Sequence, residues 1–223
     1  IGVGVVGLGR IFEDNHLPQI SACPDMELVA VADVTESRRA RWQNSINVPV
    51  YDDMQAILAD DEIQLVLILT PSRFHHSHVL AALRAGKHVM VEKPMAIRVN
   101  EVENIGHAAR EKKVVAMVGH TFLFNQAVRY VKGLIDGGEL GDIRYIYSQR
   151  VNLGRIRNDV DALWNLAPHD VSIIQYWLGD PNPRSISKIG MDYVQKGIND
   201  VVFLLSLIHI SEPTRPLYIS YAV

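Results

Sequence analysis

The chain has 223 residues, of which 48% are hydrophobic and 21% are charged, as is ordinary for a globular protein with a sizeable apolar core. Its net charge is -3, and its Lys and Arg residues are scattered, which argues against a nucleic-acid partner. The longest apolar runs, such as Leu65–Leu69, are far shorter than a membrane span. A single cysteine, Cys23, suits a reducing compartment, so we expect a cytoplasmic protein with no membrane partner.

The first half of the chain alternates short apolar runs with longer segments of helical spacing. The apolar runs, which predict buried strands, are Val3–Gly7, Leu28–Ala32, Leu65–Leu69, His88–Val91 and Val114–Val118. The segments that predict helices are Ile11–Ser21, Glu36–Asn44, Asp53–Ala59, His78–Ala85 and Asn100–Lys112. Continuous Val, Ile and Leu runs separated by helices are typical of a parallel sheet covered on both faces. We therefore predict that residues 1–118 form an α/β domain with a doubly wound parallel sheet of the Rossmann type.

The pattern changes after Gly119. A helix is predicted over Asn125–Asp136, ending at a glycine pair, and an apolar-faced helix over Leu163–Leu178. Three further segments read as strands: Ile143–Leu153, Ile186–Ile189 and Val201–Leu204. This mixture predicts that residues 119–204 form part of an α+β domain with an open sheet of about three strands.

The segment Gly7-Leu8-Gly9-Arg10-Ile11-Phe12 follows the first predicted strand and opens the first predicted helix. Glycines at such a junction allow a tight turn and let backbone N–H groups approach a pyrophosphate at the helix N-terminus. We therefore predict that Gly7, Gly9, Arg10 and Ile11 contact a bound dinucleotide. Phe12 replaces the third glycine of the usual fingerprint, and the alternative is an ordinary glycine turn between a strand and a helix.

Asp33 ends the second predicted strand, where dinucleotide-binding domains carry an acidic residue for the adenosine ribose hydroxyls. A carboxylate here repels a 2′-phosphate and favours NAD over NADP. Arg38 and Arg39 follow closely, weaken this preference and leave NADP as the alternative cofactor. In the other interpretation Asp33 is a turn or helix-capping aspartate, a role that Thr35 fills equally well.

Three further stretches carry a family resemblance. Thr70-Pro71-Ser72, followed by His75, comes directly after the run Leu65–Leu69. Ala85-Gly86-Lys87-His88-Val89 leads into Glu92-Lys93-Pro94, and Asn165 and His169 lie four residues apart in one predicted helix. Together with the glycine loop, these stretches resemble the Gfo/Idh/MocA family (glucose–fructose oxidoreductase, inositol dehydrogenase and rhizopine catabolism proteins) over residues 1–204.

The resemblance implies roles for the Glu-Lys-Pro turn. In that family the strand bearing this motif ends beside the nicotinamide, at the carboxyl edge of the sheet. Lys93 would then reach the substrate hydroxyl and stabilise the developing alkoxide, and it would also contact the cofactor. Glu92 would fix the geometry near the cofactor, and Pro94 would hold the turn. The alternative is an ion pair that precedes an ordinary surface turn.

The resemblance makes His169 the second catalytic group, because an imidazole can take the hydroxyl proton as hydride leaves the carbinol carbon. Family members usually carry Asp four residues earlier, on the same helix face. Here that position is Asn165, which can hold the imidazole or a substrate hydroxyl but cannot accept a proton. The alternative for His169 is an ordinary helix residue bonded to backbone.

The resemblance also assigns the segment after Leu65–Leu69 to the cofactor's ribose and nicotinamide, with Ser72 in place of the usual Asn. The residues concerned are Thr70, Pro71, Ser72 and His75. The neighbouring histidines His75, His76 and His78 raise the alternative of a metal site. Adjacent histidines on a helix point in different directions, and no carboxylate or cysteine completes a set, so no metal is expected.

Polar groups accompany the long strand predicted in the second domain. Those that suit substrate recognition are Gln149, Arg150, Asn152, Arg155 and Arg157, since arginine matches a carboxylate or phosphate. They are equally consistent with an ordinary sheet surface or a subunit interface.

The segment Leu205–Arg215 resembles the translated sequence of a transposase adapter used in shotgun sequencing. We therefore interpret residues 205–223 as a non-native, adapter-derived tail on a C-terminally truncated fragment of a family member. The alternative is a genuine strand followed by a proline-rich tail.

The resemblance finally implies a function. It is that of a dehydrogenase or reductase transferring a hydride between NAD or NADP and a hydroxyl carbon of a sugar, an inositol or a nucleotide sugar. The partner would be a small-molecule polyol or sugar, and the full-length protein would be a homo-oligomer. Because Asn165 cannot accept a proton, the alternative is a non-catalytic sensor that binds NAD and a sugar.

Overall fold

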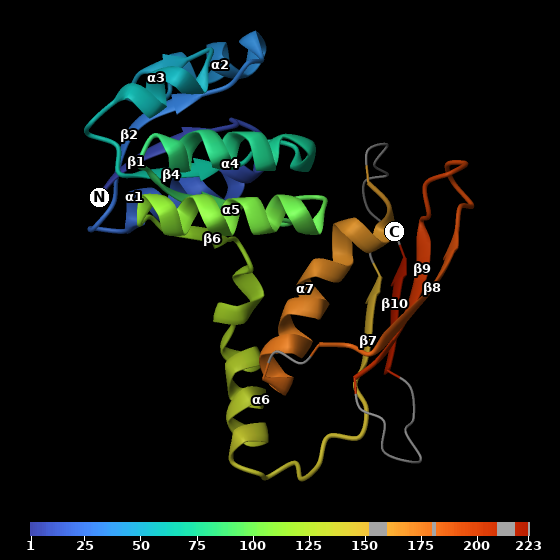
Figure 1. The fold of residues 1–223 in the computed structure, drawn as a ribbon. Coiled ribbons are helices and arrows are strands. Elements are labelled where there is room, and N and C mark those ends of the chain that lie inside the picture. The colour runs from blue at the N-terminus through green and yellow to red at the C-terminus, as the bar shows by residue number, and fades with distance from the viewer. Residues whose placement is uncertain (152–159, 180–181, 209–216, 223) are drawn as a thin grey trace. The chain divides into compact units, whose positions relative to one another are not determined.

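The computed structural model describes residues 1–151, 160–179, 182–208 and 217–222. The chain divides into two compact units, Ile1–Gly119 and His120–Val223. Figure 1 shows the helices and strands of each unit, which are described separately below.

The first unit contains a six-stranded parallel sheet with the order β3-β2-β1-β4-β5-β6. The strands are β1 (Gly2–Val6), β2 (Glu27–Ala32), β3 (Val50–Tyr51), β4 (Leu65–Ile68), β5 (His88–Val91) and β6 (Ala116–Val118). The chain runs outward from β1 to β3 and then returns to add β4, β5 and β6 on the other side. This order confirms the predicted doubly wound sheet and makes the gap between β1 and β4 its switch point, where such sheets bind ligands.

Helices cover both faces of this sheet, as the unbroken apolar runs of its strands require. They are α1 (Leu17–Ala22), α2 (Glu36–Gln43), α3 (Met54–Ala59), α4 (His75–Arg84) and α5 (Val99–Lys112), with short helical turns at η1 (Phe12–His16) and η2 (Ser72–Phe74). On one face, side chains of η1, α1 and α2 pack against Val3 and Val5. On the other face, α3, α4 and α5 pack against Val6 and neighbouring strands.

Phe12, the residue in place of the third fingerprint glycine, belongs to the core. Its ring is fully buried and lies edge-on to Trp42, with the ring centroids 5.1 Å apart. Burying such a side chain contributes about 2–3 kcal/mol. The helix predicted over Ile11–Ser21 is present but irregular. Its first part, Phe12–His16, is a π-helix, and α1 begins only at Leu17.

The second unit is α+β, as predicted. It consists of η3 (Thr121–Phe124), α6 (Gln126–Asp136), β7 (Tyr147–Val151), α7 (Ala162–Leu178), β8 (Ser185–Met191), β9 (Val201–Leu207) and β10 (Leu217–Ala222). The strand order is β7-β10-β9-β8, in which β10 runs parallel to β7 and the other pairs are antiparallel. One face is covered by α7, whose Leu166 and Ile174 pack with Val202 of β9.

Two expectations for this unit are wrong. The strand predicted over Ile143–Leu153 begins only at Tyr147 and ends at Val151, with residues 152–153 outside the described residues. The sheet has four strands instead of three, because Leu217–Ala222 pairs with both β7 and β9.

The proposed limit of the native chain at residue 204 coincides with no structural break, since β9 continues to Leu207. That residues 205–223 are adapter-derived stays a prediction.

Within the part of the chain that the structure describes, no helix is long and apolar enough to cross a membrane.

Candidate dinucleotide-binding site

The glycine loop between β1 and η1 lies at the carboxyl edge of the sheet. Gly7 has a φ of 104°, and a Cβ on it would lie 2.9 Å from the carbonyl carbon of Leu69. Both facts demand glycine at this position. A Cβ on Gly9 would instead meet no protein atom within 4 Å. The backbone at Gly9 is therefore open to a group approaching from outside, which is what a pyrophosphate-binding turn requires.

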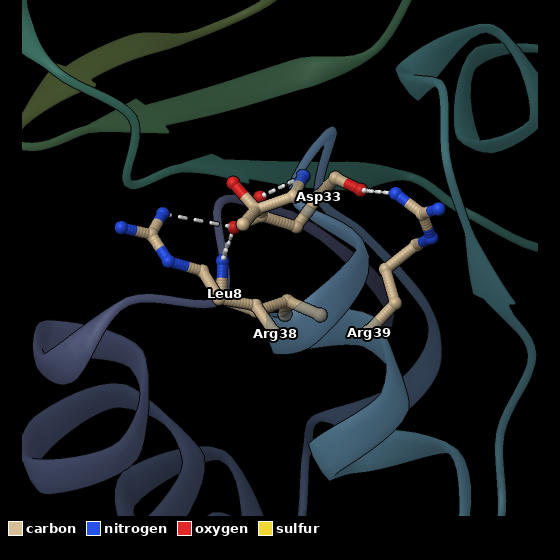
Figure 2. Close-up of polar contacts among 5 residues, drawn as sticks. Leu8, Asp33, Arg38 and Arg39 are labelled. Carbon is tan, nitrogen blue, oxygen red and sulfur yellow. Dashed lines mark hydrogen bonds and ion pairs between the residues drawn. The ribbon is translucent and has the colours of Figure 1, made fainter.

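Asp33 holds this loop from the end of β2 (Figure 2). Its Oδ2 accepts a hydrogen bond from the Leu8 amide at 2.8 Å, and its Oδ1 accepts one from the Thr35 amide at 2.8 Å. Burial alone would raise the pKa of this carboxyl, but the amides of Thr35 and Leu8, with Arg38, outweigh burial and lower the pKa. Asp33 is therefore a turn aspartate, as in the alternative interpretation. It also connects the end of β2 to the glycine loop through the Leu8 amide.

Two arginines of α2 flank Asp33 (Figure 2). Nη1 of Arg38 lies 3.2 Å from Oδ2 of Asp33, and Nη1 of Arg39 donates to the Asp33 backbone carbonyl at 2.9 Å. Arg38 is half exposed, whereas the Asp33 side chain is almost fully buried. A positive charge thus lies beside the carboxylate on its exposed side, which reduces the repulsion that Asp33 would exert on a phosphate.

A cavity of about 350 Å³ opens beside Asp33. Of the residues predicted to bind a cofactor, Gly7, Asp33, Thr70 and Pro71 line it. Arg73, Phe74 and His78 of η2 and α4 also line it. The apolar walls, the glycine backbone and the carboxylate together fit the adenosine end of a dinucleotide.

The remaining residues of the glycine loop lie near the surface. Arg10 is exposed, and its Nε donates to Oδ2 of Asp14 at 2.7 Å, an interaction that raises the pKa of the guanidinium. Ile11 is half-buried against the core that surrounds Phe12. Their predicted contacts with a dinucleotide stay predictions.

The Glu-Lys-Pro turn begins at the end of β5. The Glu92 carboxylate lies 3.0 Å from Nε2 of His16, and its other oxygen accepts a hydrogen bond from the Lys93 amide at 3.3 Å. Burial alone would raise the pKa of Glu92, but His16 and Lys93 outweigh burial and lower the pKa. The peptide bond between Lys93 and Pro94 is cis. The turn is therefore fixed by Glu92 rather than exposed as a surface ion pair.

His75 lies between the Thr70 loop and the Glu-Lys-Pro turn. The side chain is buried, with Nδ1 at 2.6 Å from the Pro94 carbonyl oxygen and Nε2 at 2.7 Å from that of Thr70. Both ring nitrogens thus face backbone carbonyl oxygens, and since a carbonyl only accepts, a neutral ring donates to one of the two. The predicted contact of His75 with a cofactor stays a prediction. Ser72 forms the start of η2 and is half-buried.

His78 lies at the wall of the cavity, with Nδ1 at 3.2 Å from the Thr70 hydroxyl. Burial and the nearby His75 lower its pKa, and Asp53 opposes them. Among the described residues, no group of three His, Cys, Asp or Glu side chains is arranged to hold a metal ion.

His169 and Asn165 both lie on α7, in the second unit. The His169 ring packs edge-on against Phe122, with the centroids 4.8 Å apart, and the Arg150 guanidinium covers the same Phe122 ring at 4.9 Å. Arg150 is in turn held by Asp170 through Nε at 2.8 Å and Nη2 at 3.2 Å. Arg150 therefore has a structural partner, while Asn152, Arg155 and Arg157 lie outside the described residues.

Sequence reasoning missed His16. It lies beyond the glycine fingerprint, and neither its spacing nor its helical position relates it to the Glu-Lys-Pro turn. The sequence contained one related signal. Phe12 replaces the third glycine of the fingerprint, and the irregular part of the helix begins at that residue.

The switch-point cavity, the glycine loop and the buried acidic residue define the first unit as a dinucleotide-binding α/β domain. Comparison with known proteins agrees, because residues 1–120 match the oxidoreductase family with an NAD-binding Rossmann fold. The chain belongs to this family, Gfo/Idh/MocA.

Individual relatives in the comparison are also dehydrogenases. The chain is 32% identical over 164 residues to a scyllo-inositol 2-dehydrogenase (NADP⁺) from Bacillus subtilis, which covers 74% of this chain and 44% of the relative. It is 32% identical over 205 residues to D-glucoside 3-dehydrogenase from Escherichia coli, covering 84% and 58%. The chain thus spans about half the length of the curated relatives it matches.

Solved structures share the fold. The scyllo-inositol dehydrogenase from Lactobacillus casei, solved with NAD(H) and scyllo-inositol, superposes with a TM-score of 0.87 at 23% identity. That alignment covers 100% of this chain and 69% of the other. A probable dehydrogenase from Thermotoga maritima gives the same TM-score at 21% identity, covering 99% and 68%.

Proposed function

We propose that the protein is an NAD(P)-dependent oxidoreductase that transfers a hydride between the nicotinamide and a hydroxyl-bearing carbon of a sugar, an inositol or a nucleotide sugar. The observation that carries the proposal is the tie between Asp33 and the Leu8 amide, because it connects the acidic residue to an open glycine backbone at the switch point. The named activities of the relatives on inositol and glucosides support the substrate class.

In this proposal the protein's own groups bind and orient the reactants. The glycine loop and Asp33 hold the dinucleotide, with Thr70, Pro71 and Ser72 along its ribose and nicotinamide. Bound NAD(P) supplies the hydride acceptor. The Lys93 ammonium stabilises the oxygen as negative charge develops on it. His169 accepts the hydroxyl proton, so that hydride and proton leave the same alcohol and a carbonyl remains.

Asp33 favours NAD, and Arg38 permits NADP. A 2′-phosphate would meet the Asp33 carboxylate, whose oxygens are already bonded to backbone amides. The half-exposed guanidinium of Arg38 lies beside it and offers a phosphate a cationic partner. We infer that NAD binds more tightly than NADP and that NADP is still accepted.

The second candidate function is that of a sensor which binds NAD and a sugar without turnover. Asn165 supports it, because an amide replaces the family's carboxylate four residues before His169 and cannot accept a proton. The two candidates share the cofactor site and differ only in turnover.

We further propose that the protein is a cytoplasmic homo-oligomer. The face of the second sheet opposite α7 supports this, since it exposes Tyr147, Val151, Ile189 and Phe203. Apolar side chains gathered on one open sheet face commonly mark an interface.

The test has two stages. Titration of NADH fluorescence measures cofactor binding, and absorbance of reduced nicotinamide across a panel of inositols, sugars and nucleotide sugars measures turnover. Lys93→Ala and His169→Ala are expected to lower turnover at least about a hundredfold, whereas His107→Ala, at an exposed helix position, leaves it unchanged. Binding without turnover would favour the sensor. Absence of NAD and NADP binding would refute both candidates.

A further inference from the structure

The Glu92 carboxylate is held at the meeting point of three strand ends. Residue Glu92 follows β5, and its backbone amide donates to the Ile68 carbonyl of β4 at 3.0 Å. Its Oε1 lies 3.0 Å from His16, which belongs to the helical turn after β1. A Cβ on Gly119, directly after β6, would lie 3.5 Å from the same oxygen. Glu92 is therefore enclosed by the elements that form the carboxyl edge of the sheet.

The contact with His16 is largely protected from water, because both side chains are only 13% exposed. A carboxylate at this depth needs a partner to offset its lost hydration. The second oxygen of Glu92 is bonded to the Lys93 amide, which orients the backbone of the following residue. One carboxylate thus connects an imidazole of the glycine-loop helix to the backbone of Lys93.

Phe12 and His16 are the first and last residues of one helical turn and contact different parts of the first unit. Phe12 is fully buried in the core beside Trp42. His16, at the other end of the π-helical segment, meets Glu92 at the edge of the sheet.

We propose that His16 is a positioning residue: it fixes the Glu92 carboxylate and, through it, the backbone of Lys93. The contact thereby joins the helix that would receive the pyrophosphate to the turn that carries Lys93. The inference rests on the proposed function for its catalytic meaning, but the linkage itself is a property of the first unit. His16 touches neither substrate nor cofactor in this scheme.

The lowered pKa of Glu92 supports the linkage. Burial raises the pKa of this carboxyl, and the His16 ring is the largest of the influences that lower it. Removal of the ring leaves burial opposed only by the Lys93 amide and the Lys93 charge. The Glu92 carboxyl is therefore expected to titrate at higher pH without His16. A purely packing role for His16 would not produce this change.

The experiment compares His16→Ala, His16→Gln, Glu92→Gln and the double variant His16→Ala/Glu92→Gln with the wild-type chain. His107→Ala serves as the matched control, since it removes an exposed histidine of the same unit. The first readout is the ¹³C NMR titration of the Glu92 carboxyl carbon, assigned by the signal that disappears in Glu92→Gln. The second is the dissociation constant for NADH.

We expect His16→Ala to move the Glu92 titration to higher pH and to weaken NADH binding at least about tenfold, the size of one lost hydrogen bond to a charged group. His16→Gln keeps a donor toward the carboxylate and should restore much of both properties. In the Glu92→Gln background, His16→Ala should change NADH binding less than about twofold, because the negative charge that the imidazole partners is gone. His107→Ala should change neither readout.

An unchanged Glu92 titration in His16→Ala would overturn the proposal, as would additive effects of the two substitutions on NADH binding. Should His16→Ala unfold, His16→Gln and the titration of Glu92 in it decide the question. If the wild-type chain does not bind NADH, the proposed function fails. The titration still decides the linkage independently of it.

Discussion

Asp33 illustrates how one residue serves two interactions at the scale of single side chains. Its position after an apolar strand predicted an acidic group for a ribose, and the structure lines the cavity with it. The same carboxylate also binds the amides of Leu8 and Thr35. The second role depends on the path of the glycine loop in space, which spacing along the sequence does not describe.

Asp33→Asn should weaken both NAD binding and the fold. An amide NH₂ cannot accept a hydrogen bond, so one of the two backbone amides would lose its acceptor. We expect a loss of about 1–2 kcal/mol in the free energy of unfolding, measured by urea denaturation at pH 7. NADH affinity, measured by fluorescence, should fall about tenfold for a loss of similar size. Unchanged affinity would show that Asp33 serves the loop alone.

The stability difference between wild type and Asp33→Asn should depend on pH. The pKa of Asp33 is lowered by folding, so the unfolded chain binds the proton at higher pH than the folded chain does. The contribution of the carboxylate is therefore complete above its unfolded pKa and disappears as the pH falls through the lower, folded value. Urea curves from neutral pH to about pH 3 should show the gap closing. A gap that stays constant would mean that the carboxylate is not the source.

At the scale of elements, most strands and helices follow from the sequence because their signals are local. The strand His88–Val91 has the predicted bounds, and α7 begins at Ala162, one residue before the predicted start. Departures occur where distant packing intervenes. Phe12 enters the core beside Trp42, and the helix there is π-wound. The strand predicted from Ile143 begins only at Tyr147, where β10 pairs with it.

The two glycines of the loop should respond differently to the same substitution. Gly7→Ala places a Cβ 2.9 Å from the Leu69 backbone at a positive φ, so we expect it to destabilise the fold by about 2–3 kcal/mol. Gly9→Ala meets open space and should leave the melting temperature nearly unchanged. It should nevertheless weaken NADH binding at least about tenfold, because its methyl group occupies the approach of the pyrophosphate. Thermal melts and NADH titrations of both variants check this, and normal affinity in Gly9→Ala would contradict the assigned loop.

At the scale of the whole molecule, the chain forms two units with separate cores. In the second unit, β10 lies between β7 and β9, so the last described strand along the chain is an inner strand of its sheet. Resemblance of Leu205–Arg215 to a translated adapter predicts a non-native tail from residue 205, and within that range Leu217–Ala222 pairs with both neighbouring strands.

A chain that ends at residue 204 should separate these views. It lacks the last part of β9 and all of β10, which exposes the paired backbone edges of β7 and β9. We expect the second unit to lose its cooperative unfolding transition while NADH binding by the first unit persists. Calorimetry and NADH titration measure the two outcomes. A second unit that melts as before would support the adapter interpretation.

The sequence by itself determined the doubly wound sheet, the glycine loop, the acidic residue at the end of β2 and the placement of Lys93 at the end of β5. These rest on periodicity and on residues adjacent along the chain. Tertiary structure alone decided that His16 meets Glu92, 76 residues away, and that Asp170 holds Arg150 over Phe122. It also decided that the two ring nitrogens of His75 lie within hydrogen-bond distance of the carbonyl oxygens of Pro94 and Thr70. Such pairings depend on how helices wind and pack, and a local pattern contains no record of which distant side chain will lie opposite.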